Sequence, residues 1–323
     1  MKKILSVVLV TMMLLAGCAN GETTQEENET EVKQTIKVAV SVPPQATMVK
    51  AIGGDLIEVV TMIPPGYSPA NYAPTQKEMT ALSDSQLYFG IDVPTEVVNI
   101  MPMIEGSGYD IKVIDLAAAV DNTYPARYFG ESDHEDHEDH EDHENHDSED
   151  PVDEHAHDHD HAGRDPHIWL SVKRIEVMVN EMEKELSEVS PENAETFKSN
   201  RDDYIEKLRG VDSDLQEMFK AFEHRSFLIY HPSLGYFAEA YGLEMVPLES
   251  EGKAATVQGM ASVIEYAKEH GIQTVFYQEE FDSKQAELLA DEIGGTAVQL
   301  SPLDENIVGN LKEMGTLIRN SFE

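Results

Sequence analysis

The sequence has almost no cysteine and few basic side chains, and both shortages exclude classes of protein. Its 323 residues include a single cysteine, Cys18, so no disulfide can form within the chain. Lysine and arginine together number 23 against 62 aspartates and glutamates, which gives a formal net charge of −39. A charge of this sign repels nucleic-acid phosphates and anionic membrane surfaces, so we expect no nucleic-acid partner. A negative charge of this size favours cations as ligands.

The sequence also lacks an apolar run long enough to span a bilayer comfortably, which takes about 20 residues. Its longest run, Ile4 to Leu15, follows two lysines and is typical of a signal peptide. The next residues, Ala16-Gly17-Cys18, match the lipobox of bacterial lipoproteins, and this resemblance implies cleavage before Cys18 and diacylation of its sulfur. The alternative is a simple secretory signal with a chance cysteine. We expect an extracytoplasmic lipoprotein, anchored through Cys18 to the outer face of the bacterial cytoplasmic membrane.

One stretch of the sequence is unusually rich in histidines interspersed with acidic residues. The stretch HEDHEDHEDHENHDSEDPVDEHAHDHDH has no basic residue and no apolar side chain larger than Val152, so it cannot form a core. It is either a solvated, disordered acidic loop or a metal-collecting arm, and we interpret it as a weak zinc trap. Imidazole with carboxylate, and without thiolate, suits zinc, copper or nickel better than calcium or magnesium. The auxiliary low-affinity ligands would be His134, His137, His140, His143, His146, His155, His157, His159 and His161.

The rest of the chain alternates strand-like and helix-like stretches, which predicts an α/β fold. Strands are expected at 35–42, 56–63, 85–91, 109–116, 226–231, 244–249, 273–278 and 296–300. Apolar residues at helical spacing after Ser190-Pro191 predict one long helix. We therefore predict two Rossmann-like lobes joined by a long rigid helix. The expected segments are a signal peptide (1–17), a flexible tether (18–34), the N-terminal lobe (35–130), the His-rich loop (131–164), the end of that lobe with the joining helix (165–222), and the C-terminal lobe (223–323).

Of the four histidines outside the rich stretch, two are candidate metal ligands. His167 stands in GRDPHIWLSV, and His231 ends the predicted strand of LIYHPSLGYF. Prolines beside them, Pro166 and Pro232, stiffen the backbone. A lone histidine at such a place is most often structural, but each of these belongs to a different lobe and would face the crevice between the two. Neutral imidazole is a good zinc ligand, so the pair predicts a metal site.

Several motifs resemble, in order, those of substrate-binding lipoproteins of zinc/manganese ABC importers. They are IPPGYSPANYAPTQKEM, DPHIWLSV, YHPSLGYFAEAYGLE, VFYQEEFDSKQAELLADEIGG and LSPLDENIVGNL, and the likeness covers essentially all of 36–323. The resemblance implies two pseudo-symmetric lobes, a rigid backbone helix, a His-rich loop in zinc-specific members, and a divalent metal in the cleft. It also implies an ABC permease and its ATPase as partners, no catalysis, and a monomer. His167 and His231 match the second and third metal histidines of the family.

Two positions depart from the family pattern. Ala70 stands where the first metal histidine is usual, and Ser301 stands where a late acidic ligand is usual. The substitutes that we considered are Asn71, Gln278, Glu279, Glu280, Asp304 or a histidine from the rich loop. Among these we favour Gln278, at the end of a predicted strand, and then Glu279. The predicted metal set is therefore His167, His231, Gln278 and Glu279.

The functional prediction is an extracytoplasmic protein that binds Zn²⁺ and delivers it to a permease. Mn²⁺ is the alternative ligand, and a surface adhesin or zinc buffer of the same fold is an alternative role. A metallo-hydrolase using His167 and His231 with a carboxylate is disfavoured, because neither an H-E-x-x-H helix nor a two-metal carboxylate set is found in the sequence.

Overall fold

The computed structural model describes residues 35–129, 163–222, 225–249 and 256–323. The predicted signal peptide and tether, Cys18 and the nine loop histidines lie outside these ranges. Within them, no helix has both the length and the apolar character needed to cross a bilayer.

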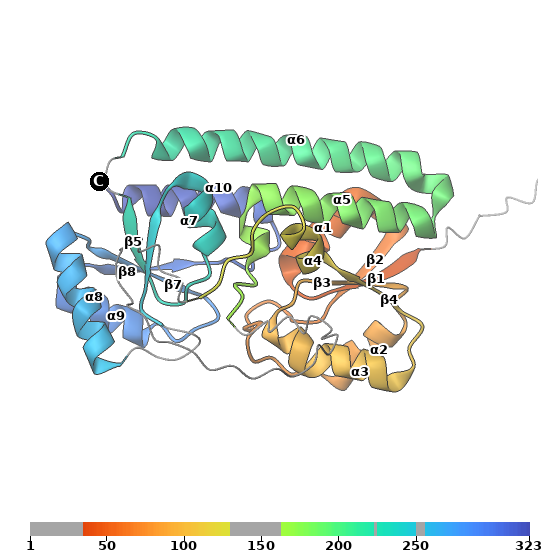
Figure 1. Ribbon diagram of the computed structural model, residues 1–323, viewed down its shortest axis with the longest axis horizontal. Coiled ribbons are helices and arrows are strands. Elements are labelled where there is room, and N and C mark those ends of the chain that lie inside the picture. The colour runs from red at the N-terminus through yellow and green to blue at the C-terminus, as the bar shows by residue number, and fades with distance from the viewer. Residues whose placement is uncertain (1–34, 130–162, 223–224, 250–255) are drawn as a thin grey trace, which may run out of the picture. The chain divides into compact units, whose positions relative to one another are not determined.

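The described chain contains two four-stranded parallel sheets of the same topology (Figure 1). The first has the order β2-β1-β3-β4, with β1 Ile36–Val40, β2 Ile57–Thr61, β3 Leu87–Gly90 and β4 Lys112–Asp115. The second has the order β6-β5-β7-β8, with β5 Ser226–Ile229, β6 Glu244–Pro247, β7 Thr274–Gln278 and β8 Thr296–Leu300. This confirms the predicted pair of α/β lobes.

Helices bury both faces of each sheet, as parallel strands require. Successive residues of a strand point to opposite faces, so Val38 and Val40 join the core shared with the long helices while Ala39 packs on the other side. Around the first sheet lie α1 Pro43–Gly53, α2 Gln76–Ser83, α3 Met101–Ser107, α4 Leu116–Asp121 and α5 Val172–Val189. Around the second lie α7 Gly235–Tyr241, α8 Val257–His270, α9 Lys284–Ile293 and α10 Ile307–Asn320.

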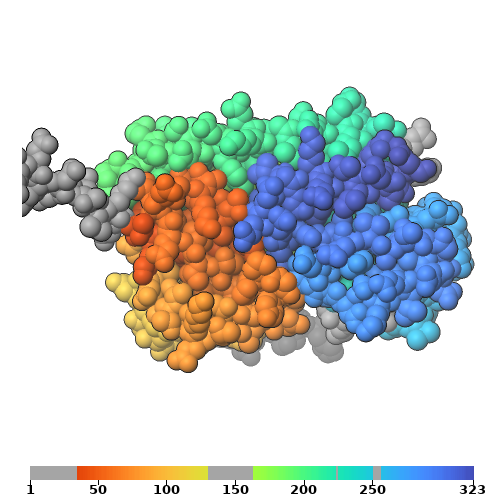
Figure 2. Space-filling view, turned by 180° about the vertical axis from the view of Figure 1, so that it is seen from behind, coloured from red at the N-terminus to blue at the C-terminus, as the bar shows by residue number. Residues whose placement is uncertain are grey.

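The predicted long helix is α6, Ala194–Phe219. Its 26 residues extend about 40 Å at 1.5 Å per residue. It packs against α1 and α5 of the first lobe and against α7 and α10 of the second. In the space-filling view its green surface runs along both the orange and the blue halves (Figure 2). The start differs slightly from expectation, because Pro191–Asn193 form a 3₁₀ turn before the α-helix begins.

Three elements after β3 and β4 were not predicted from the sequence. They are a π-helical turn at Glu96–Ile100, α3, and α4. The valines of the π-helical turn and Pro102 at the start of α3 have low helix propensity, which hid the helical character of this stretch.

Candidate metal centre

His167 lies just before the 3₁₀ turn Ile168–Leu170 that leads into α5, on a segment held by hydrogen bonds. Its backbone N–H and its Nδ1–H both donate to Asp165 Oδ1, at 3.0 and 2.7 Å. Asp165 itself is buried, with 2% of its surface exposed. The carboxylate therefore fixes both the backbone turn and the orientation of the imidazole. An Nδ1–H donor leaves the lone pair of the ring on Nε2, the atom that a metal would bind.

Tyr128 and Arg164 lie on either side of residues 130–162, which are outside the described ranges, and we call this pair of residues the neck. Tyr128 and Arg164 make an antiparallel bridge, and the N–H of Phe129 donates to the carbonyl of Gly163 at 2.7 Å. Arg164 makes two hydrogen bonds to Asp121, at 2.8 and 2.9 Å, which fasten the neck to the end of α4. The described residues that flank 130–162 are therefore paired with each other, close to His167.

His231 follows β5 and belongs to the second lobe. Its Nδ1 donates to Glu249 Oε2 at 2.9 Å, and its ring stacks on Phe281 with centroids 4.9 Å apart. Burial lowers the pKa of His231 below its usual value, an effect that the Glu249 carboxylate opposes. The imidazole is accordingly neutral at pH 7, the state in which it can bind a metal.

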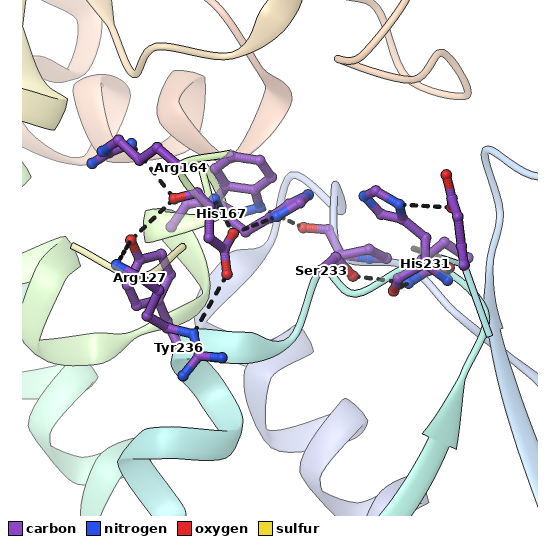
Figure 3. Close-up of polar contacts among 11 residues, drawn as sticks. Arg127, Arg164, His167, His231, Ser233 and Tyr236 are labelled. Carbon is purple, nitrogen blue, oxygen red and sulfur yellow. Dashed lines mark hydrogen bonds and ion pairs between the residues drawn. The ribbon is translucent and has the colours of Figure 1, made fainter. Parts of the chain in front are cut away.

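The two predicted histidines meet. Their ring centroids are 5.2 Å apart, with 69° between the ring planes. Figure 3 shows the rings opposite each other, each with its own hydrogen bond to a carboxylate. Because Asp165 and Glu249 are buried and anionic, they add negative potential beside the pair, which favours a bound dication. Neither carboxylate was predicted from the sequence, although Asp165 stands only two residues before His167.

The pair is not a complete metal site by itself. Among the described residues, no group of three or more His, Cys, Asp or Glu side chains is placed to hold an ion. A metal ion at this pair would need further ligands, from side chains that turn toward the pair, from water, or from parts of the chain outside the described ranges.

Gln278 lies beneath His231 and hydrogen bonds to its turn. Its Nε2 donates to the His231 carbonyl at 2.6 Å and to Ser233 Oγ at 2.9 Å, while its Oε1 accepts from the His231 N–H at 3.3 Å. The side chain is 1% exposed. Through these hydrogen bonds Gln278 holds the His231 backbone in place. Its role as a metal ligand stays a prediction.

The two glutamates after Gln278 differ in burial. Glu279 is exposed, and its Oε2 accepts from Ser301 Oγ at 3.4 Å, so a carboxylate lies next to the position where the late acid is missing. Burial raises the pKa of Glu280 to about 6. The charge of Glu279 contributes to this raised pKa, and His231 opposes it. Glu280 therefore lies near enough to His231 for the protonation of one group to affect the other.

The segment with the missing histidine is fastened to the first lobe. The Pro69 carbonyl accepts from the Thr95 N–H at 3.0 Å, and the Tyr72 carbonyl accepts from Thr95 Oγ1 at 3.2 Å and from Asn99 Nδ2 at 2.9 Å. Ala70 and Asn71 are exposed on this segment, as is Asp304 after β8.

Comparison with known proteins gives a family and several relatives. The family model described as "Zinc-uptake complex component A periplasmic" matches residues 38–316. The zinc-binding protein AdcA of Streptococcus pyogenes serotype M3 is 28% identical over 302 residues, which are 92% of this chain and 56% of AdcA. This chain thus spans little more than half the length of that relative.

The high-affinity zinc uptake system protein ZnuA of Bacillus subtilis is 28% identical over 303 residues, covering 93% of this chain and 88% of ZnuA. Among solved structures, a crystal structure of ZnuA superposes with a TM-score of 0.75 at 28% identity, covering 90% of this chain and 100% of that one.

Proposed function

Since this chain belongs to the family of periplasmic A components of zinc-uptake complexes, we propose that it captures Zn²⁺ outside the cytoplasm and delivers it to an ABC permease and its ATPase. It acts as a solute-binding component, and no chemical step is assigned to it. The observation that carries the proposal is the His167–His231 pair, contributed by two different lobes and held 5.2 Å apart.

The chemistry of the pair supports zinc. Two imidazoles, each oriented by a carboxylate, are the donor type that zinc binds at about 2.0–2.1 Å. Oxygen-only cations such as Ca²⁺ and Mg²⁺ are disfavoured by the same donors. Mn²⁺ would accept them less well, because manganese prefers carboxylate, carbonyl and water ligands.

The remaining ligands are proposed from the residues around His231. Glu279 and Glu280 are carboxylates within two residues of β7, and Glu280 is near enough to His231 for that histidine to affect its pKa. The oxygen of Gln278 is the other proposed donor. Ala70 and Ser301 cannot replace the usual ligands. We therefore expect this site to bind zinc more weakly than a site with three histidines and an acid.

Two further parts of the proposal concern segments outside the described ranges. Cys18 is proposed to carry the lipid that anchors the protein to the outer face of the bacterial cytoplasmic membrane, and the nine loop histidines are proposed to collect zinc weakly near the neck. The neck at Tyr128 and Arg164 places the ends of that stretch beside His167, which supports the second idea.

The test is calorimetric titration of Zn²⁺ into three proteins. Replacing His167 and His231 together by alanine should abolish the single tight site and keep weak binding of several ions. Deleting residues 131–161 should keep the tight site and remove the weak binding. Tight binding that survives the double substitution would contradict the assignment. A parallel titration with Mn²⁺ checks the alternative metal, which would be supported by the tighter binding of manganese.

A further inference from the structure

The two segments that carry the metal histidines also join the lobes to each other. Tyr236 is the second residue of α7, five residues after His231, and is fully buried. Its hydroxyl accepts a hydrogen bond from the Arg127 N–H and donates one to the Asp165 carbonyl, both at 3.0 Å. Arg127 and Asp165 are themselves paired, since the Asp165 N–H donates to the Arg127 carbonyl at 2.8 Å. The Tyr236 hydroxyl, from the second lobe, thus bonds to the backbones of two residues of the first lobe, Arg127 and Asp165, which also bond to each other.

This group of three residues includes Asp165, which lies two residues before His167. Asp165, whose carbonyl accepts from Tyr236, holds the His167 imidazole through Oδ1. Its other oxygen, Oδ2, faces Arg127 Nε at 3.7 Å. In the view of Figure 3 the Tyr236 group lies on the left, His231 on the right, and the His167 ring between them.

The backbone of α7 packs directly on the same group. A Cβ added at Gly235 would lie 2.6 Å from Arg127 Nε and 2.7 Å from Asp165 Oδ2, so no side chain fits there. On the other side, the Arg174 guanidinium of α5 stacks over the Tyr236 ring at 4.0 Å and pairs with Glu239 at 3.7 Å. The position of Tyr236 is therefore fixed by contacts from three residues of the first lobe, Arg127, Asp165 and Arg174.

Building on the proposed zinc site, we propose that Tyr236 is a positioning residue for the metal. Its hydroxyl holds the Asp165 backbone at a fixed place relative to the start of α7, and α7 is continuous with the His231 turn. The Tyr236–Asp165–His167 contacts consequently set the position of the His167 ring with respect to His231. Without the hydroxyl, the interlobe joint loosens and the two imidazoles no longer meet in one arrangement.

The chain provides a closely matched control for removing this hydroxyl. Tyr241 lies on the same helix, is 6% exposed, and donates its hydroxyl to Asp212 Oδ1 of α6 at 3.0 Å. Tyr236→Phe and Tyr241→Phe delete the same atom from the same element, and both should lower the melting temperature by a few degrees, about the effect of one buried hydrogen bond. Only Tyr236→Phe interrupts the connection to His167.

The experiment measures Zn²⁺ affinity of the full chain by competition with a chromophoric chelator, and the visible spectrum of the Co²⁺-loaded protein. Tyr236→Phe should weaken zinc binding about 10-fold, the lower end of the range for outer-shell partners, and alter the Co²⁺ bands. Tyr241→Phe should change neither measurement. Equal affinities and equal spectra in the two variants would overturn the positioning role.

Two more variants keep the outcomes distinct. Gly235→Ala should displace Arg127 and Asp165 and weaken zinc binding as Tyr236→Phe does, whereas Gly106→Ala, where nothing lies within 4 Å, should not. His231→Ala tests the underlying site. If it leaves zinc affinity unchanged, the proposed metal site is wrong; if it weakens binding while Gly235→Ala and Tyr236→Phe do not, only the positioning role is wrong.

Discussion

At the scale of single residues, the most unusual group outside the metal centre is Glu96. Its carboxylate is buried between the ends of β1 and β3, where it accepts hydrogen bonds from Ser41 Oγ and from the N–H groups of Ile91 and Asp92, the latter at 2.8 Å. Tyr88 completes the cluster through Ser41 Oγ at 2.9 Å. Burial raises the pKa of Glu96 to about 7, although the hydrogen bonds act in the opposite direction.

This raised pKa predicts a pH dependence of stability. The folded protein holds a proton on Glu96 up to about pH 7, whereas the unfolded chain releases it near pH 4.5, so the folded state binds more protons between these values. The contribution is fully present below about pH 4.5 and is lost as pH rises through about 7. The free energy of unfolding should fall across this window by on the order of 3 kcal/mol from this group.

Glu96→Gln should remove that part of the slope, measured by urea unfolding at a series of pH values between 4.5 and 7.5. Glu58→Gln, which neutralises an exposed carboxylate of β2, serves as the control and should leave the slope in place. An identical slope in wild type and Glu96→Gln would show that the Glu96 carboxyl does not titrate in this range.

The residues of the metal centre were only partly predictable from the sequence. His167 and His231 stand out because each is an isolated imidazole beside a proline, and their meeting follows from the two-lobe fold. Asp165 and Glu249 were missed because acidic residues are so abundant in this chain that no single one is conspicuous. The hydrogen-bonding role of Gln278 depends on the strand order β5–β7, which local sequence does not contain.

At the scale of elements, α6 depends on close packing against α10. Gly315 of α10 faces Leu215 of α6, and a Cβ added at Gly315 would lie 2.2 Å from Leu215 Cδ2 and 3.5 Å from Phe237. Leu215 is fully buried, so it has little room to move aside. The absence of a side chain at Gly315 therefore sets the distance between these two helices.

Two glycine-to-alanine changes in this helix pair should have opposite signs. Gly315→Ala should destabilise the protein by about 1–3 kcal/mol through overpacking. Gly210→Ala, in the interior of α6 with nothing within 4 Å, should stabilise it by up to about 1 kcal/mol because alanine is the better helix former. Chemical denaturation measures both, and a stabilising Gly315→Ala would contradict the packing described for α6 and α10.

The strands and long helices were predictable because their patterns are strong. Runs such as IKVAV and TVFYQ are rich in β-branched and aromatic residues, and the apolar residues of α6 recur at helical spacing. The π-helical turn at Glu96–Ile100 was not predictable, since Val97 and Val98 favour strands in isolation. Its geometry is stabilised by the hydrogen bonds that Glu96 accepts, one from the distant Ser41 and others from the nearby N–H groups of Ile91 and Asp92.

At the scale of the whole described unit, one apolar core connects the lobes. A single cluster of buried residues includes Val38 of the first sheet, Leu208 of α6 and Phe276 of the second sheet. Neither lobe can lose its inner layer of helices without exposing part of the other's core. Folding of the two sheets should consequently be coupled.

This predicts one cooperative unfolding transition, followed by circular dichroism and tyrosine fluorescence. Zn²⁺ at about 100 times its dissociation constant should stabilise the folded protein by about 2.7 kcal/mol, and a chelator should reverse the shift. The variant lacking both His167 and His231 should show the single transition without the cleft-dependent shift. Two separate transitions in wild type would indicate that the lobes unfold independently.

The neck at Tyr128 and Arg164 has a consequence for engineering and for evolution. Tyr128 and Arg164 are paired with each other, and Arg164 is fastened to Asp121. We therefore expect the fold to stay the same when the number of residues between these two positions changes. Each doubling of an insert's length costs only about 0.6 kcal/mol of closure entropy. The neck is thus a ready graft point, where a shorter tract, a longer one or a foreign peptide could be spliced in without altering the register of any strand.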